Sequence, residues 1–159
     1  MADILQKGAA AQARGDAKAL TAQSRALDLM AARPTDGEPD LAQQWAAQAR
    51  ALGAPTQVST PFRGRTLGPA YRSGQVSANG SFHTRQNFNA GHRAEIVVVP
   101  VDAARLSLQV RDDDGGSICT VAPSTGNLGC RWVPPFTGAS DIEVRNEMNQ
   151  QVSFYMVLN

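Results

Sequence analysis

Arg105-Leu-Ser-Leu-Gln-Val-Arg111 is the stretch of sequence that decides the fold class. Leu106, Leu108 and Val110 alternate with polar residues, and a period of two places these apolar side chains on one face of a strand. The next five residues, 112–116, read Asp-Asp-Asp-Gly-Gly and predict a turn, because glycine adopts positive φ without strain. The segment therefore predicts a strand with one buried face, followed by a reversal of the chain.

Further strands are predicted on both sides of this segment. Residues 96–99 form a β-branched cluster that Pro100 is expected to end, since proline cannot donate to a strand ladder. Ile142 and Val144 alternate with charged residues, and residues 152–158 form the last apolar run. Short strands with turn signals every eight to twelve residues predict a β-sandwich or a β-barrel.

Two weaker strands are predicted upstream of this run. Residues 73–78 and 81–88 flank the dipeptide Asn79-Gly80. Asn-Gly is the strongest short-range signal for a two-residue hairpin turn. The sequence therefore predicts that these two strands pair as a β-hairpin.

The N-terminal part has a helical composition, rich in Ala, Gln, Leu and Arg. It predicts three helices, at residues 3–14, 16–32 and 40–52. Gly15 suits the C-terminal stop of the first helix, and Asp16 suits the N-cap of the second. The residues around this junction weakly resemble the turn and second helix of a tetratricopeptide-type hairpin, although a single unit is visible where such arrays need about three.

The predicted helices carry a short apolar stripe, formed by Leu20, Leu27, Leu41, Trp45 and Leu52. Three helices of this size are expected to be too small for a core of their own. They would pack on each other, on the sandwich or on a second copy, and a partner protein or a homo-oligomer is expected on this ground.

The predicted fold class is α+β, a short N-terminal α-helical segment followed by an antiparallel β-sandwich. The predicted domain organisation is a helical hairpin plus third helix at residues 1–54, a linker at 55–70 and a sandwich at 71–159. The linker is predicted from its Pro, Gly, Ser and Thr content, and it contains Arg63 and Arg65.

Composition excludes several classes of function. The chain has 159 residues, 42% of them hydrophobic and 18% charged, with a net charge of +1. A near-neutral chain gives no reason to expect nucleic-acid binding. No stretch approaches the roughly 20 apolar residues of a membrane helix, so no membrane span is expected. Met1-Ala2-Asp3 leads directly into helical sequence, so no signal peptide is recognised.

Cys119 and Cys130 are the only cysteines, and they flank a loop rich in Pro, Ser, Thr, Gly and Asn. They are expected to face each other on adjacent strands and form a disulfide. The alternative is a pair of buried free thiols. Because disulfides persist in oxidising compartments, the pair predicts a periplasmic or secreted protein.

Four motifs in the β part occur in a recognisable order. They are Phe88-Asn-Ala-Gly, Leu106-Ser-Leu-Gln-Val-Arg-Asp-Asp-Asp-Gly, Phe136-Thr-Gly-Ala-Ser-Asp-Ile-Glu-Val-Arg-Asn and Tyr155-Met-Val-Leu. Together they resemble the bacterial pre-peptidase C-terminal domain over about residues 71–159. The motifs are turn glycines and alternating strands, so they bear on fold more than on function.

The resemblance implies a jelly-roll-like sandwich in secreted or periplasmic proteins, usually without catalytic activity. Members of the family accompany proteases and other exported proteins, and some bind calcium or fibrous substrates. Two departures limit what carries over. Ser81-Phe-His-Thr lacks the acidic residue that often begins the family's sandwich, so no calcium ligand is carried over from there, and a helical segment stands where a catalytic partner domain is usual.

Two candidate sites follow from the residues themselves. Trp132 and Phe136 flank two prolines, with Arg131 and Tyr155 as candidate neighbours, and this set predicts a flat surface for a sugar or peptide. The alternative is that Trp132 and Phe136 close one end of the core. The cluster Asp112, Asp113 and Asp114 is a weak candidate for calcium, since carboxylates attract hard cations, and the alternative is a solvated turn. No other cofactor is expected.

No catalytic residue is predicted. His83 and His92 lack the spacing of a metal or triad motif, and no Gly-x-Ser-x-Gly elbow occurs. Arg63, Arg65, Arg72 and Arg85 form a basic strip for anionic glycans only if they gather on one surface.

The leading hypothesis is a non-catalytic binding or assembly module that recognises a protein or glycan at the cell envelope. The alternatives are an accessory or inhibitory domain of an exported hydrolase, and a small hydrolase with a spatially assembled site.

Overall fold

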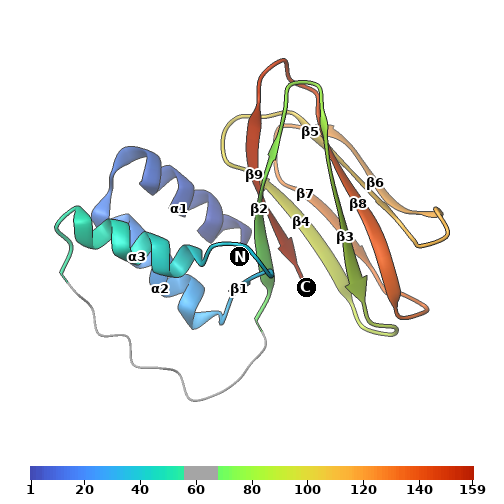
Figure 1. Cartoon of the computed structure of the whole chain (residues 1–159), viewed down its shortest axis with the longest axis horizontal. Helices are drawn as coiled ribbons and strands as arrows, with labels where there is room; N and C mark the ends of the chain where they lie inside the picture. Colours follow the sequence, from blue (N-terminus) through green and yellow to red (C-terminus); the bar gives the residue numbers. More distant parts are fainter. Residues whose placement is uncertain (56–67) are drawn as a thin grey trace. The chain divides into compact units, whose positions relative to one another are not determined.

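The computed structural model describes residues 1–55 and 68–159, and the described residues form two compact units, Met1–Arg72 and Ser73–Asn159 (Figure 1). Three helices and nine strands occur among them, in the order expected of an α+β chain. Residues 56–67 of the predicted linker, with Arg63 and Arg65, lie outside the described residues.

The first unit holds all three helices. They are α1 (Ala2–Arg14), α2 (Ala17–Leu29) and α3 (Leu41–Ala51). Gly15 closes α1 in the left-handed conformation at φ 65°, and the Asp16 carboxylate accepts a hydrogen bond from the Ala19 amide at 2.9 Å. Both predicted caps are therefore confirmed. Helix α2 ends three residues before the predicted boundary, because Ala31 adopts a φ of 49° that a helix cannot contain.

Trp45 organises a small core inside this unit. Its side chain is fully buried against Gly8, where an added Cβ would lie 2.1 Å from the ring. Its indole N–H donates to Gln12 Oε1 at 3.2 Å, and the buried Ser24 hydroxyl donates to the Ala42 carbonyl at 2.7 Å. The expectation that the helices are too small for a core of their own is wrong, because glycine at position 8 lets the indole lie against the α1 backbone.

A short strand completes the unit. The two-residue strand β1 (Arg33–Pro34) pairs in parallel with the start of β2 (Ala70–Val76), through Arg33↔Ala70 and Pro34↔Tyr71. The buried Tyr71 hydroxyl accepts a hydrogen bond from the Leu41 amide at 2.9 Å, and this bond ties the start of β2 to the first turn of α3.

The second unit is an antiparallel β-sandwich. Its further strands are β3 (Ser81–Phe88), β4 (Ala94–Pro100), β5 (Leu106–Arg111), β6 (Ser117–Ser124), β7 (Leu128–Trp132), β8 (Gly138–Asn146) and β9 (Val152–Leu158). One sheet has the strand order β1-β2-β9-β4-β7 and the other β3-β8-β5-β6. The eight strands from β2 to β9, divided between the two sheets in this order, make a jelly roll, as predicted.

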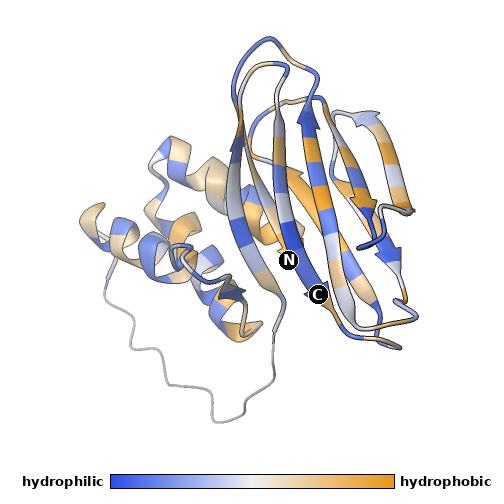
Figure 2. Cartoon of the chain, turned by 45° about the vertical axis from the view of Figure 1, so that its right-hand side comes forward, coloured by the Kyte–Doolittle hydropathy of each residue, from blue (hydrophilic) through white to orange (hydrophobic). Residues whose placement is uncertain are grey.

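The core lies between the two sheets, and hydrophobic and hydrophilic residues alternate along the strands (Figure 2). Ile96, Val110 and Val144 are fully buried. Phe82 of β3 meets Phe154 of β9 edge to face, with ring centroids 5.3 Å apart, so an aromatic pair joins the two sheets. Gly74 permits this packing, because a Cβ there would lie 2.4 Å from Phe154.

The predicted hairpin around Asn79-Gly80 is wrong. The turn exists, with the Gly80 amide donating to the Ser77 carbonyl at 3.0 Å and Asn79 at φ 52°. However, β2 and β3 belong to different sheets, and β3 pairs with β8. The local turn signal was correct, but pairing with distant strands decides which sheet each arm joins.

Candidate binding surface

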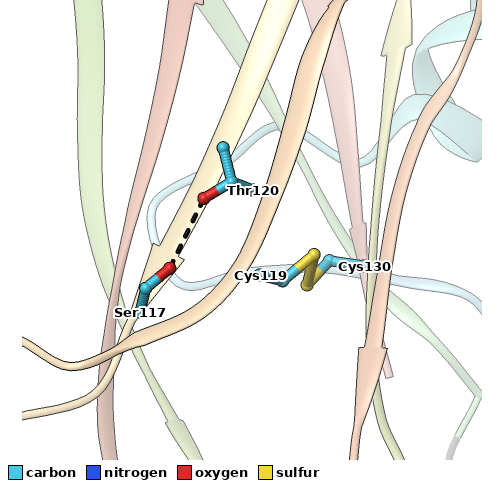
Figure 3. Close-up of a disulfide and its surroundings, with 4 residues drawn as sticks. All are labelled: Ser117, Cys119, Thr120 and Cys130. Carbon is cyan, nitrogen blue, oxygen red and sulfur yellow. Dashed lines mark hydrogen bonds between the residues drawn. A yellow bond between two sulfur atoms is a disulfide. The ribbon is translucent and has the colours of Figure 1, made fainter.

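A disulfide links Cys119 on β6 to Cys130 on β7 (Figure 3). These strands belong to different sheets, so the bond ties one edge of the sandwich together. Cys130 is fully buried. The predicted disulfide is confirmed.

Trp132 stands at the end of β7 on the core side of its sheet. It pairs with the buried Ala94 across β4 and β7. Its ring meets the Phe88 ring of the opposite sheet at 4.8 Å between centroids and 70° between planes. Trp132 is therefore half-buried and closes this end of the core, which is the alternative role weighed for it from the sequence.

Phe136 lies beyond Trp132 in the β7–β8 loop and is 81% exposed. Val133 in the same loop is 59% exposed, whereas Pro134 between them is buried. We call residues Val133–Phe136 the apolar loop. It presents one aromatic and one aliphatic side chain to solvent.

Hydrogen bonds from the neighbouring β3–β4 loop hold the apolar loop in place. The Gly91 amide donates to the Pro134 carbonyl at 2.9 Å, and the Ala90 amide donates to Thr137 Oγ1 at 2.9 Å. Gly91 has a φ of 72°, a conformation that favours glycine. Because two prolines and two cross-loop hydrogen bonds restrict the loop, little conformational entropy is left to lose when Phe136 binds a partner.

Arg131 and Tyr155 do not join Trp132 and Phe136. Arg131 pairs with Glu95 across the strands, and its Nε donates to Glu95 Oε1 at 2.7 Å. Tyr155 pairs with Val99, on the same face as Glu95 and opposite to Trp132. Tyr155 is buried, and burial raises the pKa of its hydroxyl above 10.0. The structure thus separates the four predicted residues and keeps Phe136, next to Trp132, on the surface.

The three aspartates form the predicted turn. The Asp112 carboxylate accepts a hydrogen bond from the Gly116 amide at 2.6 Å, and Asp113 forms an ion pair with Arg85. Among the described residues, no group of three or more His, Cys, Asp or Glu side chains is placed to hold a metal ion. Calcium binding by Asp112, Asp113 and Asp114 stays a prediction.

One cluster on the outward face of β3 and β8 has the residue types of a hydrolase triad. The Ser81 hydroxyl donates to Glu143 Oε1 at 2.9 Å, and His83 Nε2 lies 4.0 Å from the same oxygen. A triad requires the imidazole between the hydroxyl and the carboxylate, so that it can take the hydroxyl proton. Here the carboxylate occupies that place, and the arrangement does not activate Ser81.

The basic strip was the less favoured interpretation of Arg63, Arg65, Arg72 and Arg85, and both of its described members lie near carboxylates. Arg72 lies 3.6 Å from Glu38 in the first unit, and Arg85 pairs with Asp113 and Asp141 in the second.

A groove in the helical unit was not predicted from the sequence. It has a volume of about 680 Å³ and is bordered by α2 and by the residues that follow α3. The lining residues are Ala17, Lys18, Thr21, Ala22, Arg25, Ala26, Leu29, Leu52, Gly53, Ala54 and Pro55. Leu52 belongs to the apolar stripe predicted from the sequence, but it caps α3 and is 47% exposed.

Among the described residues, no helix is both long and apolar enough to cross a membrane.

The β-sandwich is similar to several solved structures. They include the pre-peptidase C-terminal domain of Bacillus anthracis collagenase, at 9% identity and a TM-score of 0.46, covering 57% of this chain and 89% of that one. A mitogen from Yersinia pseudotuberculosis aligns at 13% identity and a TM-score of 0.47, covering 57% of this chain and 84% of that one. A periplasmic inhibitor of g-type lysozyme from Aeromonas hydrophila aligns at 15% identity and a TM-score of 0.43, covering 57% of this chain and 84% of that one.

At these identities and TM-scores the similarities carry no conclusion about function. No protein-family model matches the chain. No curated protein matches it in sequence. None of the comparisons supports the tetratricopeptide-like resemblance of the helices.

Proposed function

We propose that the chain is a non-catalytic protein-binding module that works in the periplasm or outside the cell and docks through its apolar loop. The observation that carries the proposal is the 81% exposure of Phe136 in a loop that two hydrogen bonds and two prolines hold in place. Large exposed aromatic side chains on rigid loops are typical anchors of protein interfaces, where they fill a pocket of the partner.

Several features support a protein rather than a glycan as the partner. Val133 adds an aliphatic side chain beside Phe136, and aliphatic groups suit a dry protein pocket. Sugar recognition needs an aromatic face combined with polar groups that fix orientation. Trp132 turns its ring toward Phe88, and Arg131 is engaged by Glu95, so neither offers such a surface beside Phe136. The inter-sheet disulfide supports an oxidising compartment.

Photo-crosslinking from the apolar loop tests the proposal. Phe136 is replaced by a photoreactive phenylalanine analogue and the chain is irradiated in the cells that produce it. Met30, an exposed hydrophobic residue of the helical unit outside the groove, is replaced in the same way as the control. We expect a discrete protein adduct from position 136 that position 30 does not give.

Two results would contradict the proposal. One is an adduct pattern shared by both positions, and the other is Phe136-dependent retardation of the pure chain by polysaccharides in affinity electrophoresis. An adduct to an exported hydrolase would favour the accessory or inhibitory form of the function, which activity measurements with and without the chain then decide.

A further inference from the structure

Helix α2 carries apolar residues on a second side as well as on its buried side, although a surface helix normally has a single apolar side. Its buried side consists of Leu20, Ser24 and Leu27, which belong to the core of the helical unit. A second side contributes Ala17, Thr21, Ala22, Ala26 and Leu29 to the groove described above. Leu29 is 67% exposed there.

The shape of the groove suits an α-helix. Its α2 wall runs from Ala17 to Leu29, the full length of the helix, and thirteen residues span about 20 Å. Most of the lining side chains are small, which allows a second backbone to come close. Leu29 and Leu52 are the two large apolar side chains in the lining, and they suit the i, i+3, i+4 anchors of an amphipathic helix.

The charges of the groove have a single sign. Lys18 and Arg25 line it, and none of the lining residues that the structure describes is acidic. In the described part of the chain, neither side chain forms an ion pair with a carboxylate. The two residues are seven positions apart, or about 10 Å along the same side of α2.

We propose that this groove binds an amphipathic helix of a partner protein that carries two carboxylates seven residues apart beside its leucines. Carboxylates at that spacing would meet Lys18 and Arg25 together, because both helices rise by the same amount per residue. A second copy of α2 fits poorly, because it would bring its own Lys18 and Arg25 to the same seam. The apolar loop lies in the other unit, so this binding is independent of the function proposed above.

The test uses fluorescent helical peptides of about 16 residues, long enough to span the groove. One peptide carries leucines along one face and glutamates seven residues apart, and its partner peptide has lysines in place of the glutamates. Fluorescence anisotropy with the full chain is expected to show saturable binding of the glutamate peptide and at least about tenfold weaker binding of the lysine peptide.

Charge-reversal variants locate the binding. Lys18→Glu with Arg25→Glu is expected to weaken the glutamate peptide about tenfold or more and to bring the two peptides closer in affinity. The control is Lys7→Glu with Arg14→Glu, because these residues have the same types and spacing on α1 and lie outside the groove. The control is expected to change affinity by less than about twofold, and circular dichroism confirms that both variants are folded.

Three results would overturn the proposal. The first is equal binding of the two peptides, and the second is equal weakening by the groove and control variants. The third is self-association of the chain that the groove variants abolish in sedimentation velocity, since the occupant would then be a second copy.

Discussion

Gly8→Ala distinguishes helix propensity from tertiary packing, because the two predict changes of opposite sign in the free energy of unfolding. Alanine in place of glycine inside a helix stabilises by about 1 kcal/mol. In this chain, however, the added methyl group would lie 2.1 Å from Cη2 of the fully buried Trp45 ring. Overpacking of this kind costs about 1–3 kcal/mol, and so short an approach belongs at the upper end of that range.

The expected net result is a loss of about 2 kcal/mol from the free energy of unfolding of the helical unit. Urea unfolding followed by far-UV circular dichroism measures it, because all the described helices belong to this unit. In a Trp45→Phe background the atoms nearest to Gly8 are absent, and Gly8→Ala is expected to be neutral or stabilising there. A Gly8→Ala variant that gains stability with Trp45 present would refute the packing argument.

Three further predictions concern the rest of the molecule. Replacing both Cys119 and Cys130 by serine should lower the free energy of unfolding of the sandwich by about 3 kcal/mol, because the disulfide closes a loop with a separation of 11 residues and so lowers the entropy of the unfolded chain. A free energy of unfolding equal to that of the oxidised wild type would contradict this expectation. Asn146→Ala should lower the free energy of unfolding by about 3 kcal/mol in the same assay, because the buried Asn146 amide donates to the Ser77 and Gln150 carbonyls, at 3.0 and 2.7 Å. A loss below about 1 kcal/mol would show that water replaces these bonds. Burial, reinforced by Asp40, raises the pKa of Asp28 above 3.8, so the ionised form of this side chain opposes folding as pH rises through the raised pKa. Asp28→Asn should therefore raise Tm slightly at neutral pH and leave Tm unchanged well below pH 3.8.

Local patterns in the sequence predicted the elements that depend on local physics. The alternation of Leu106, Leu108 and Val110 predicted β5, and Gly15 and Asp16 predicted the junction of α1 and α2. These features act within a few residues, so the chain carries their signal in one place. Repeated short strands predicted a sandwich or a barrel, and the resemblance to the pre-peptidase C-terminal domain selected the sandwich.

Features that depend on distant residues escaped the sequence. Asn79-Gly80 predicted a turn correctly, but the pairing of β3 with β8 took its two arms into different sheets. Gly8 gave no sign that it faces Trp45, more than thirty positions away, and so the helical core was missed.

The candidate site was predicted in part for the same reason. Trp132 and Phe136 are close in the sequence and so stay close in any fold. Whether Arg131 and Tyr155 lie near them depends on which face of the sheet each side chain takes, and the sequence alone did not show this. The groove joins α2 to the end of α3, and no local pattern connects those segments.

The most direct test of the account is the affinity of the chain for the protein captured at position 136. Calorimetry with the purified partner compares wild type, Phe136→Ala and the control Met30→Ala. The account predicts that Phe136→Ala weakens binding by about 30-fold, as an interface anchor does, while Met30→Ala stays within about twofold of wild type. Equal affinities for all three proteins would contradict the claim that the apolar loop is the binding surface.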